Sequence, residues 1–96
     1  FILGKEKKKI INTNELFTSL SSKKNNQLVK GNTNTVYINP INSLKFVLGK
    51  LKKDQVKLDR NFYVFTGSTV GVVPIIGKGI YIGKIKKLGS VKSEIK

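Results

Sequence analysis

The clearest helical periodicity of apolar and polar positions in this chain lies between residues 39 and 53. Asn39 is a residue type that caps helix N-termini, and Pro40 suits the first helical position. The apolar residues that follow recur at helical spacing and form one stripe: Ile41, Leu44, Val47, Leu48 and Leu51. Lysines fall mostly on the other side of this segment. The pattern predicts one amphipathic helix near residues 40–53, followed by a polar connection over residues 54–61.

Short apolar stretches elsewhere predict strands. They are rich in β-branched and aromatic residues, which favour pleated structure, and glycine-containing turns separate several of them. The predicted strands cover residues 28–31, 35–38, 62–65, 80–85 and 91–95, and a further apolar run covers residues 70–76. The predicted turns cover residues 77–79 and 88–90.

The first part of the chain has a weaker pattern. Leu16, Phe17 and Leu20 are spaced for one face of a helix within residues 10–20. Residues 21–27 read SSKKNNQ and contain no core-forming side chain, so they predict a polar loop. With the helix and strands above, this organisation predicts a mainly β, α+β domain with one main helix.

The composition limits the size of the core and the chemistry that the chain can perform. Its 96 residues suffice for a single domain, residues 1–96, with one modest core. Cysteine and histidine are absent, so the chain offers no disulfide, no thiolate or imidazole ligand and no histidine base. We expect no metal site from this chain alone, because its acids are scattered: Glu6, Glu15, Asp54, Asp59 and Glu94. The lack of cysteine fits a cytoplasmic protein, and no apolar run is long enough to predict a membrane span.

The formal net charge of +14 at pH 7 comes almost entirely from lysine. A surface of this charge attracts polyanions, which makes nucleic acid a candidate partner. The competing interpretation is compositional, because lysine, asparagine and isoleucine are abundant throughout the sequence. Nucleic-acid sites usually add arginine or exposed aromatic residues, whereas here Arg60 is the one arginine and the aromatic residues lie mainly in apolar runs.

The stretch FYVFTGSTVGVVPIIG, residues 62–77, contains the best candidate binding site. Its apolar start runs into Thr66, Gly67, Ser68 and Thr69, where hydroxyl groups stand beside a glycine. Glycine lets a ligand approach the backbone, and hydroxyl and N–H groups supply hydrogen-bond donors for an anion. The competing interpretation is a β-turn whose hydroxyls cap backbone groups.

Several features occur in the order and spacing of a known family. They are YINPINSLKFVLGKL at residues 37–51, Thr66-Gly67-Ser68, Val72-Val73-Pro74, Gly77 to Gly79, and Leu88-Gly89-Ser90-Val91. This series, within residues 28–95, resembles the C-terminal portion of the 2-keto-4-pentenoate hydratases, in the fumarylacetoacetate hydrolase superfamily. Residues 1–27 lie outside the resemblance. One departure is Gly77-Lys78-Gly79, where the family usually has an acid after the first glycine.

The resemblance implies a fold and a substrate. The fold would be a mixed β-sheet roll or sandwich, of which this chain forms the C-terminal part. The substrate would be a small 2-keto acid, with Ser68 contacting it, Thr66 and Gly67 shaping the turn, and Thr69 as a second donor. The reaction would be hydration or decarboxylation.

The resemblance also implies that essential parts lie elsewhere. The family binds Mg²⁺ or Mn²⁺ through a Glu-x-Glu pair and a further acid upstream of this region, and its catalytic lysine is upstream too. We therefore expect no catalytic residue and no metal ligand in this chain, and activity would require an N-terminal half or an oligomer. Position 1 is Phe rather than Met, from which we expect a processed product or a piece of a longer protein.

Two other hypotheses remain open. A non-enzymatic basic domain would bind RNA or DNA through the lysine groups at residues 5–9, 23–24 and 50–53. A subunit whose apolar strands are completed by a partner chain is the third interpretation.

Overall fold

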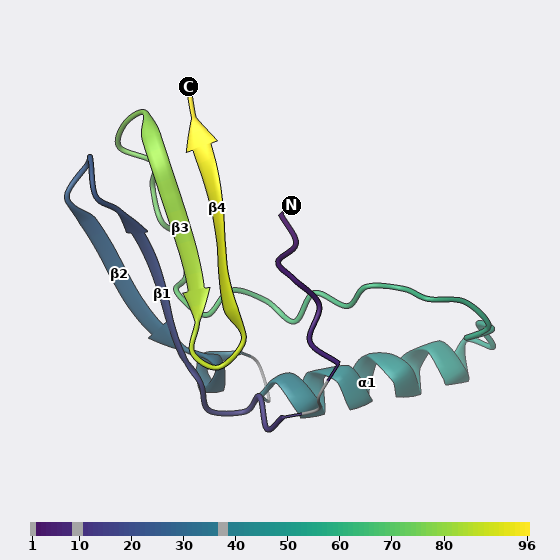
Figure 1. Cartoon of the computed structure of the whole chain (residues 1–96). Helices are drawn as coiled ribbons and strands as arrows, with labels where there is room; N and C mark the ends of the chain where they lie inside the picture. The colour runs from purple at the N-terminus through teal and green to yellow at the C-terminus, as the bar shows by residue number, and fades with distance from the viewer. Residues whose placement is uncertain (1, 9–10, 37–38) are drawn as a thin grey trace.

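The computed structural model describes residues 2–8, 11–36 and 39–96. Within these ranges the elements are β1 (Phe17–Ser22), β2 (Gln27–Asn32), the 3₁₀ turn η1 (Thr33–Thr35), α1 (Pro40–Lys53), β3 (Gly79–Ile85) and β4 (Gly89–Ile95). The strands form one 4-stranded sheet in the order β2-β1-β3-β4, and every neighbouring pair is antiparallel. Figure 1 shows the sheet on one side of the molecule and α1 extending away from it.

Tight turns join the strands of each hairpin. Between β1 and β2, the Asn26 N–H donates to the Lys23 carbonyl oxygen (3.1 Å), and Asn26 has a φ of 49°. Asparagine tolerates this left-handed conformation better than most residues, which favours the turn. Between β3 and β4, the Leu88 N–H donates to the Ile85 carbonyl oxygen (3.0 Å).

The two faces of the sheet differ in burial. Residues that alternate along a strand point to opposite faces, and residues in register on neighbouring strands share a face. We call one face inner, and its residues are mostly buried or half-buried: Thr18, Leu20, Ser22, Val29, Gly31, Tyr81, Gly83, Ile85 and Val91. The outer face is mostly exposed and includes Phe17, Ser19, Ser21, Leu28, Lys30, Ile80, Ile82, Lys84, Lys92 and Glu94.

Residues 66–78, which we call the cover segment, cross the inner face before β3 begins. A Cβ atom on Gly31 would collide with the Thr69 carbonyl oxygen, so glycine lets the segment lie directly against β2. Further along, the Gln27 Nε2 donates to the Pro74 carbonyl oxygen (3.0 Å). The segment therefore lies against β2 through its backbone and forms no strand, while Val72, Ile75 and Ile76 are exposed.

A cluster of hydrogen bonds fixes the end of the cover segment. The Asn25 Nδ2 lies 2.9 Å from Ser22 Oγ, 3.1 Å from the Lys78 carbonyl oxygen and 3.3 Å from the Tyr81 hydroxyl. The Tyr81 hydroxyl in turn donates to the Gly77 carbonyl oxygen (2.9 Å). These bonds join the β1–β2 turn to the start of β3, about fifty residues later in the chain.

The helix begins and ends where the sequence predicts. The Asn39 side chain accepts from the Asn42 N–H (3.0 Å), and Pro40 occupies the first turn. The apolar stripe of α1 is only half-buried, and Phe46 is 62% exposed. In Figure 1, residues 54–66 run back along the helix toward the sheet. The Cα radius of gyration of 15.4 Å exceeds the roughly 12.5 Å of a compact domain of this length, because this arm projects from the sheet.

The predictions for the C-terminal half and the helix are largely confirmed. The strands predicted at residues 28–31, 80–85 and 91–95 correspond to β2, β3 and β4, and the helix corresponds to α1. The predicted mainly β, α+β architecture holds in its coarse form. The sheet of the described residues is antiparallel, however, and not mixed as the resemblance implied.

Other predictions are wrong. Phe17 and Leu20 lie in β1 and not on a helix, because β1 pairs with strands on both sides; residue 10 lies outside the described residues. The loop predicted at residues 21–27 is a shorter turn in the structure, because β1 continues to Ser22 and β2 begins at Gln27. The strand predicted at residues 35–38 begins in η1 instead, and residues 37–38 lie outside the described part. The strand predicted at residues 62–65 does not form, because this stretch is irregular in the structure.

Within the described ranges, the structure contains no helix with the length and apolar character needed to cross a membrane.

We expect Gly31→Ala to lower the free energy of unfolding by about 1–3 kcal/mol, because the Thr69 backbone would have to move away from β2. Gly49→Ala is the matched control. It lies within α1, and a Cβ there meets nothing within 4 Å, so we expect a gain of about 0.5–1 kcal/mol. Urea denaturation measures both values, and a destabilisation of equal size in the two variants would contradict the position of the cover segment.

Candidate functional site

The turn that the sequence singles out uses its serine for local hydrogen bonds. Ser68 Oγ donates to the Gly71 carbonyl oxygen (2.9 Å) and accepts from the Val70 N–H (3.2 Å). Gly67 and Gly71 have φ values of 116° and 73°, which non-glycine residues rarely adopt. The geometry matches the β-turn interpretation of the sequence. Contact of Ser68 with a substrate stays a prediction.

The turn residues do not share one site. Thr66 and Thr69 are half-buried, while Gly67 and Ser68 are exposed. The Thr69 carbonyl oxygen accepts from the Thr35 hydroxyl (3.3 Å), which ties the turn to η1. Thr69 also lines a cleft on the inner face of the sheet, and Thr66, Gly67 and Ser68 do not.

This cleft has a volume of about 560 Å³. It lies between the N-terminal segment, residues 2–7, and the inner face near the β3–β4 hairpin, with Thr69 and Val70 on a third side. Figure 1 shows the N-terminal segment running beside β4. The segment approaches the sheet closely, because a Cβ on Gly4 would lie 2.9 Å from Val91 Cγ1.

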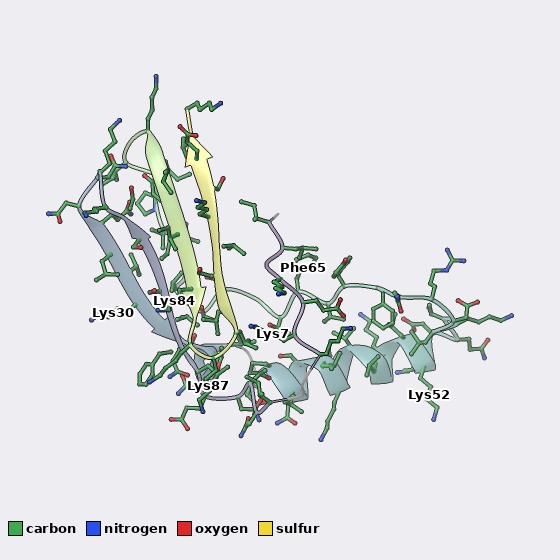
Figure 2. All side chains as sticks on the ribbon, in the orientation of Figure 1. Lys7, Lys30, Lys52, Phe65, Lys84 and Lys87 are labelled. Carbon is green, nitrogen blue, oxygen red and sulfur yellow. The ribbon has the colours of Figure 1, made fainter. Side chains whose placement is uncertain are left out.

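The outer face of the sheet presents lysines around small hydroxyl residues. Ser19 of β1 is in register with Lys30 on one side and with Lys84 on the other. Adjacent strands lie about 4.8 Å apart, so these lysines project from backbone positions separated by roughly 10 Å. Both side chains are exposed, and Figure 2 shows them on the strands that flank β1.

Apolar side chains accompany these lysines. The next row across the sheet places Leu28, Ser21, Ile82 and Lys92 in register. At the end of the same face, the Lys86 ammonium lies 5.7 Å from the centre of the Phe17 ring, and Phe17 is 67% exposed. The face therefore combines cationic groups, aliphatic surface and one exposed aromatic ring.

The lysine groups predicted from the sequence lie in separate places. Lys5 and Lys7 line the cleft, and Lys9 lies outside the described residues. Lys23 and Lys24 lie in the β1–β2 turn, while residues 50–53 lie at the far end of α1, where Figure 2 labels Lys52. The structure does not bring these groups together on one surface.

The described residues do not supply a metal-binding set. No group of three or more histidine, cysteine, aspartate or glutamate side chains lies together in the described ranges. A Mg²⁺ or Mn²⁺ ion held by ligands from outside this chain stays a prediction of the resemblance.

Comparisons of the chain with protein-family models, with curated proteins and with solved structures gave no match.

Sequence reasoning missed the outer face because it missed β1. The signal that could have revealed this face is the position of Lys30 and Lys84. Each lysine lies in a strand that the sequence predicts, and its neighbours in that strand point to the inner face. That the two lysines lie on one face, on either side of Ser19, becomes visible only when β1 is placed between β2 and β3.

We expect Ser68→Ala to lower the free energy of unfolding by about 0.5–1 kcal/mol, because the hydroxyl bridges two backbone groups of its own turn. Ser90→Ala, at an exposed position of β4, is the control and should change stability by less than about 0.5 kcal/mol. Chemical denaturation of both variants measures the difference. Equal stabilities would show that the hydroxyl contributes nothing to the turn.

Proposed function

We propose that this chain binds single-stranded nucleic acid on the outer face of its sheet. The proposal rests on one observation above all, the register of Lys30, Ser19 and Lys84 across the sheet. The small serine leaves room over the central strand, and a lysine stands on each side of it. A sugar-phosphate backbone lying over β1 could place phosphates beside both ammonium groups.

The charge of the whole chain supports the same ligand. The formal net charge is +14, and the outer face carries Lys30 on β2, Lys84 on β3 and Lys92 on β4, with one acid, Glu94, among the paired positions of β4. Lysine–phosphate contacts release counterions from the nucleic acid, and this release gives affinity without sequence preference. It also makes binding weaken as salt rises.

The exposed apolar groups favour a single strand over a duplex. Unpaired bases stack on aromatic rings and contact aliphatic surface, and Phe17, Leu28 and Ile82 offer both on this face. Duplex DNA is usually read by a helix or a two-stranded ribbon that enters the major groove, which is about 12 Å wide. A flat sheet of four strands is too broad to enter that groove along its face.

The double variant Lys30→Gln/Lys84→Gln tests this proposal. We expect about tenfold weaker binding of a fluorescent oligouridylate at low salt, measured by anisotropy. The slope of log affinity against log salt concentration should also decrease in magnitude by about 1.4, since each phosphate contact on a single strand contributes about 0.7. Both lysines are exposed, so the fold should be retained.

The matched control is Lys52→Gln/Lys53→Gln, which removes the same charge from the far end of α1. It should leave the slope almost unchanged. Equal losses in the two double variants would show that only total charge matters, and tighter binding of a duplex would contradict the choice of a single strand. Oligodeoxythymidylate, run in parallel, distinguishes a preference for RNA from a preference for single strands in general.

A second proposal follows from the resemblance to the hydratases. In it, this chain contributes part of a 2-keto acid pocket, within a roll or sandwich completed by further strands and in a cytoplasmic enzyme. The position of Thr69 on the cleft favours this proposal. Its test is a thermal-shift assay with Mg²⁺ and oxalate on a polypeptide that includes upstream residues, where the absence of both stabilisation and hydratase turnover would contradict it.

A further inference from the structure

The cleft on the inner face has the size and lining of a small-molecule site. Its volume of about 560 Å³ falls in the range of roughly 300–1,000 Å³ that is common for such sites. Leu20, Ile85 and Val91 provide an apolar floor from three strands, and Ile2 and Val70 stand across from it. Gly89 adds no side chain, and a Cβ there would meet nothing within 4 Å, so the floor stays open near the hairpin turn.

One buried polar group lies beside this apolar site without a hydrogen-bond partner in the described part of the chain. Thr18 lines the cleft and is only 6% exposed, and its Oγ1 makes no hydrogen bond within the described part of the chain. A buried hydroxyl without a partner destabilises a fold, and a ligand atom that accepts from it removes this cost. Thr18 is in register with Ile85, which is in register with Gly89, so the hydroxyl lies in the row beside the open floor.

The charges around the cleft select an anion. Lys5 and Lys7 line it from the N-terminal segment and Lys84 lines it from β3, and no aspartate or glutamate lines it. Gly4 lies against Val91, one register row away from Thr18, and the chain then continues through the two lysines. Figure 2 shows Lys7 on this segment, close to the turn end of β4 in that view. The polar end of the cleft is therefore cationic and the remainder is aliphatic.

We infer that this cleft binds a medium-chain aliphatic carboxylate. The carboxylate accepts a hydrogen bond from the Thr18 hydroxyl and is neutralised by Lys5 and Lys7, and the alkyl chain lies over Leu20 and Val91. This site lies on the inner face, and Lys30, the outer-face lysine of β2, does not line it.

Titration with octanoate, followed by heteronuclear NMR of the full chain, tests the inference. We expect shifts at inner-face residues of β1, β3 and β4. Octanol has the same tail without the charge and should bind at least about tenfold more weakly, while acetate has the charge without the tail and should produce no saturable shifts. Octanol that binds as tightly as octanoate, or octanoate shifts absent from the inner face at millimolar concentration, would overturn the inference.

Two variants test separately how the hydroxyl and the charge contribute to octanoate binding. Thr18→Val keeps the shape, removes the unpartnered hydroxyl, and should raise the melting temperature while weakening octanoate binding by about tenfold. Lys7→Gln should weaken binding by about threefold, whereas Lys52→Gln should leave it unchanged. Lys30→Gln changes a lysine that does not line the cleft, so this variant should bind octanoate normally. Unchanged octanoate affinity in both Thr18→Val and Lys7→Gln would place the ligand elsewhere.

Discussion

The contact between the cover segment and the inner face is the constraint on which the rest of this structure depends. A sheet of four strands needs one face shielded from water, and here the backbone of an irregular stretch of chain shields part of that face, where Leu20, Val29 and Ile85 stay half-buried. Gly31 permits the closest approach, beside the Thr69 carbonyl, and the Asn25 and Tyr81 side chains hold the segment where it enters β3. The chain returns from the helix to the sheet through residues 54–66, which lead into this segment.

This solution leaves much apolar surface uncovered. The cover segment occupies the inner face, so α1 is not needed there and projects from the sheet with its stripe only half-buried. Phe46 on the helix and Val56 and Leu58 on the returning loop are all exposed. The arm therefore offers an aliphatic and aromatic surface with basic residues around it, which is compatible with the third hypothesis of a partner chain. The outer face of the sheet has a different character, because its apolar side chains alternate with lysines in register.

The sequence predicts elements whose signals are local. α1 carries its own cap at Asn39 and its own stripe, and β3 and β4 are joined by a short turn, so neither depends on distant residues. β1 was not predictable in this way. Its two faces read Phe17, Ser19, Ser21 and Thr18, Leu20, Ser22, which lack the apolar–polar contrast that marks a half-buried strand. Its conformation comes from pairing with β2 and β3, and β3 lies about sixty residues away. The candidate turn was located correctly as a turn, but its spatial neighbours depend on that same long-range pairing.

The register of β1 also explains how one small sheet can provide two separate candidate sites. Thr18 and Ser19 are consecutive, so their side chains point to opposite faces, and the same holds for Gly83 and Lys84 on β3. Thr18 and Gly83 belong to the inner face, and Ser19 and Lys84 belong to the outer lysine row, although all four residues border the cleft. A slip of one residue would exchange the faces, burying Ser19 and exposing Thr18. The Lys86 N–H, which donates to the Phe17 carbonyl oxygen (2.9 Å), extends the β1–β3 pairing beyond the last register pair and opposes such a slip. Both sites therefore require the same register, although each uses side chains that the other does not.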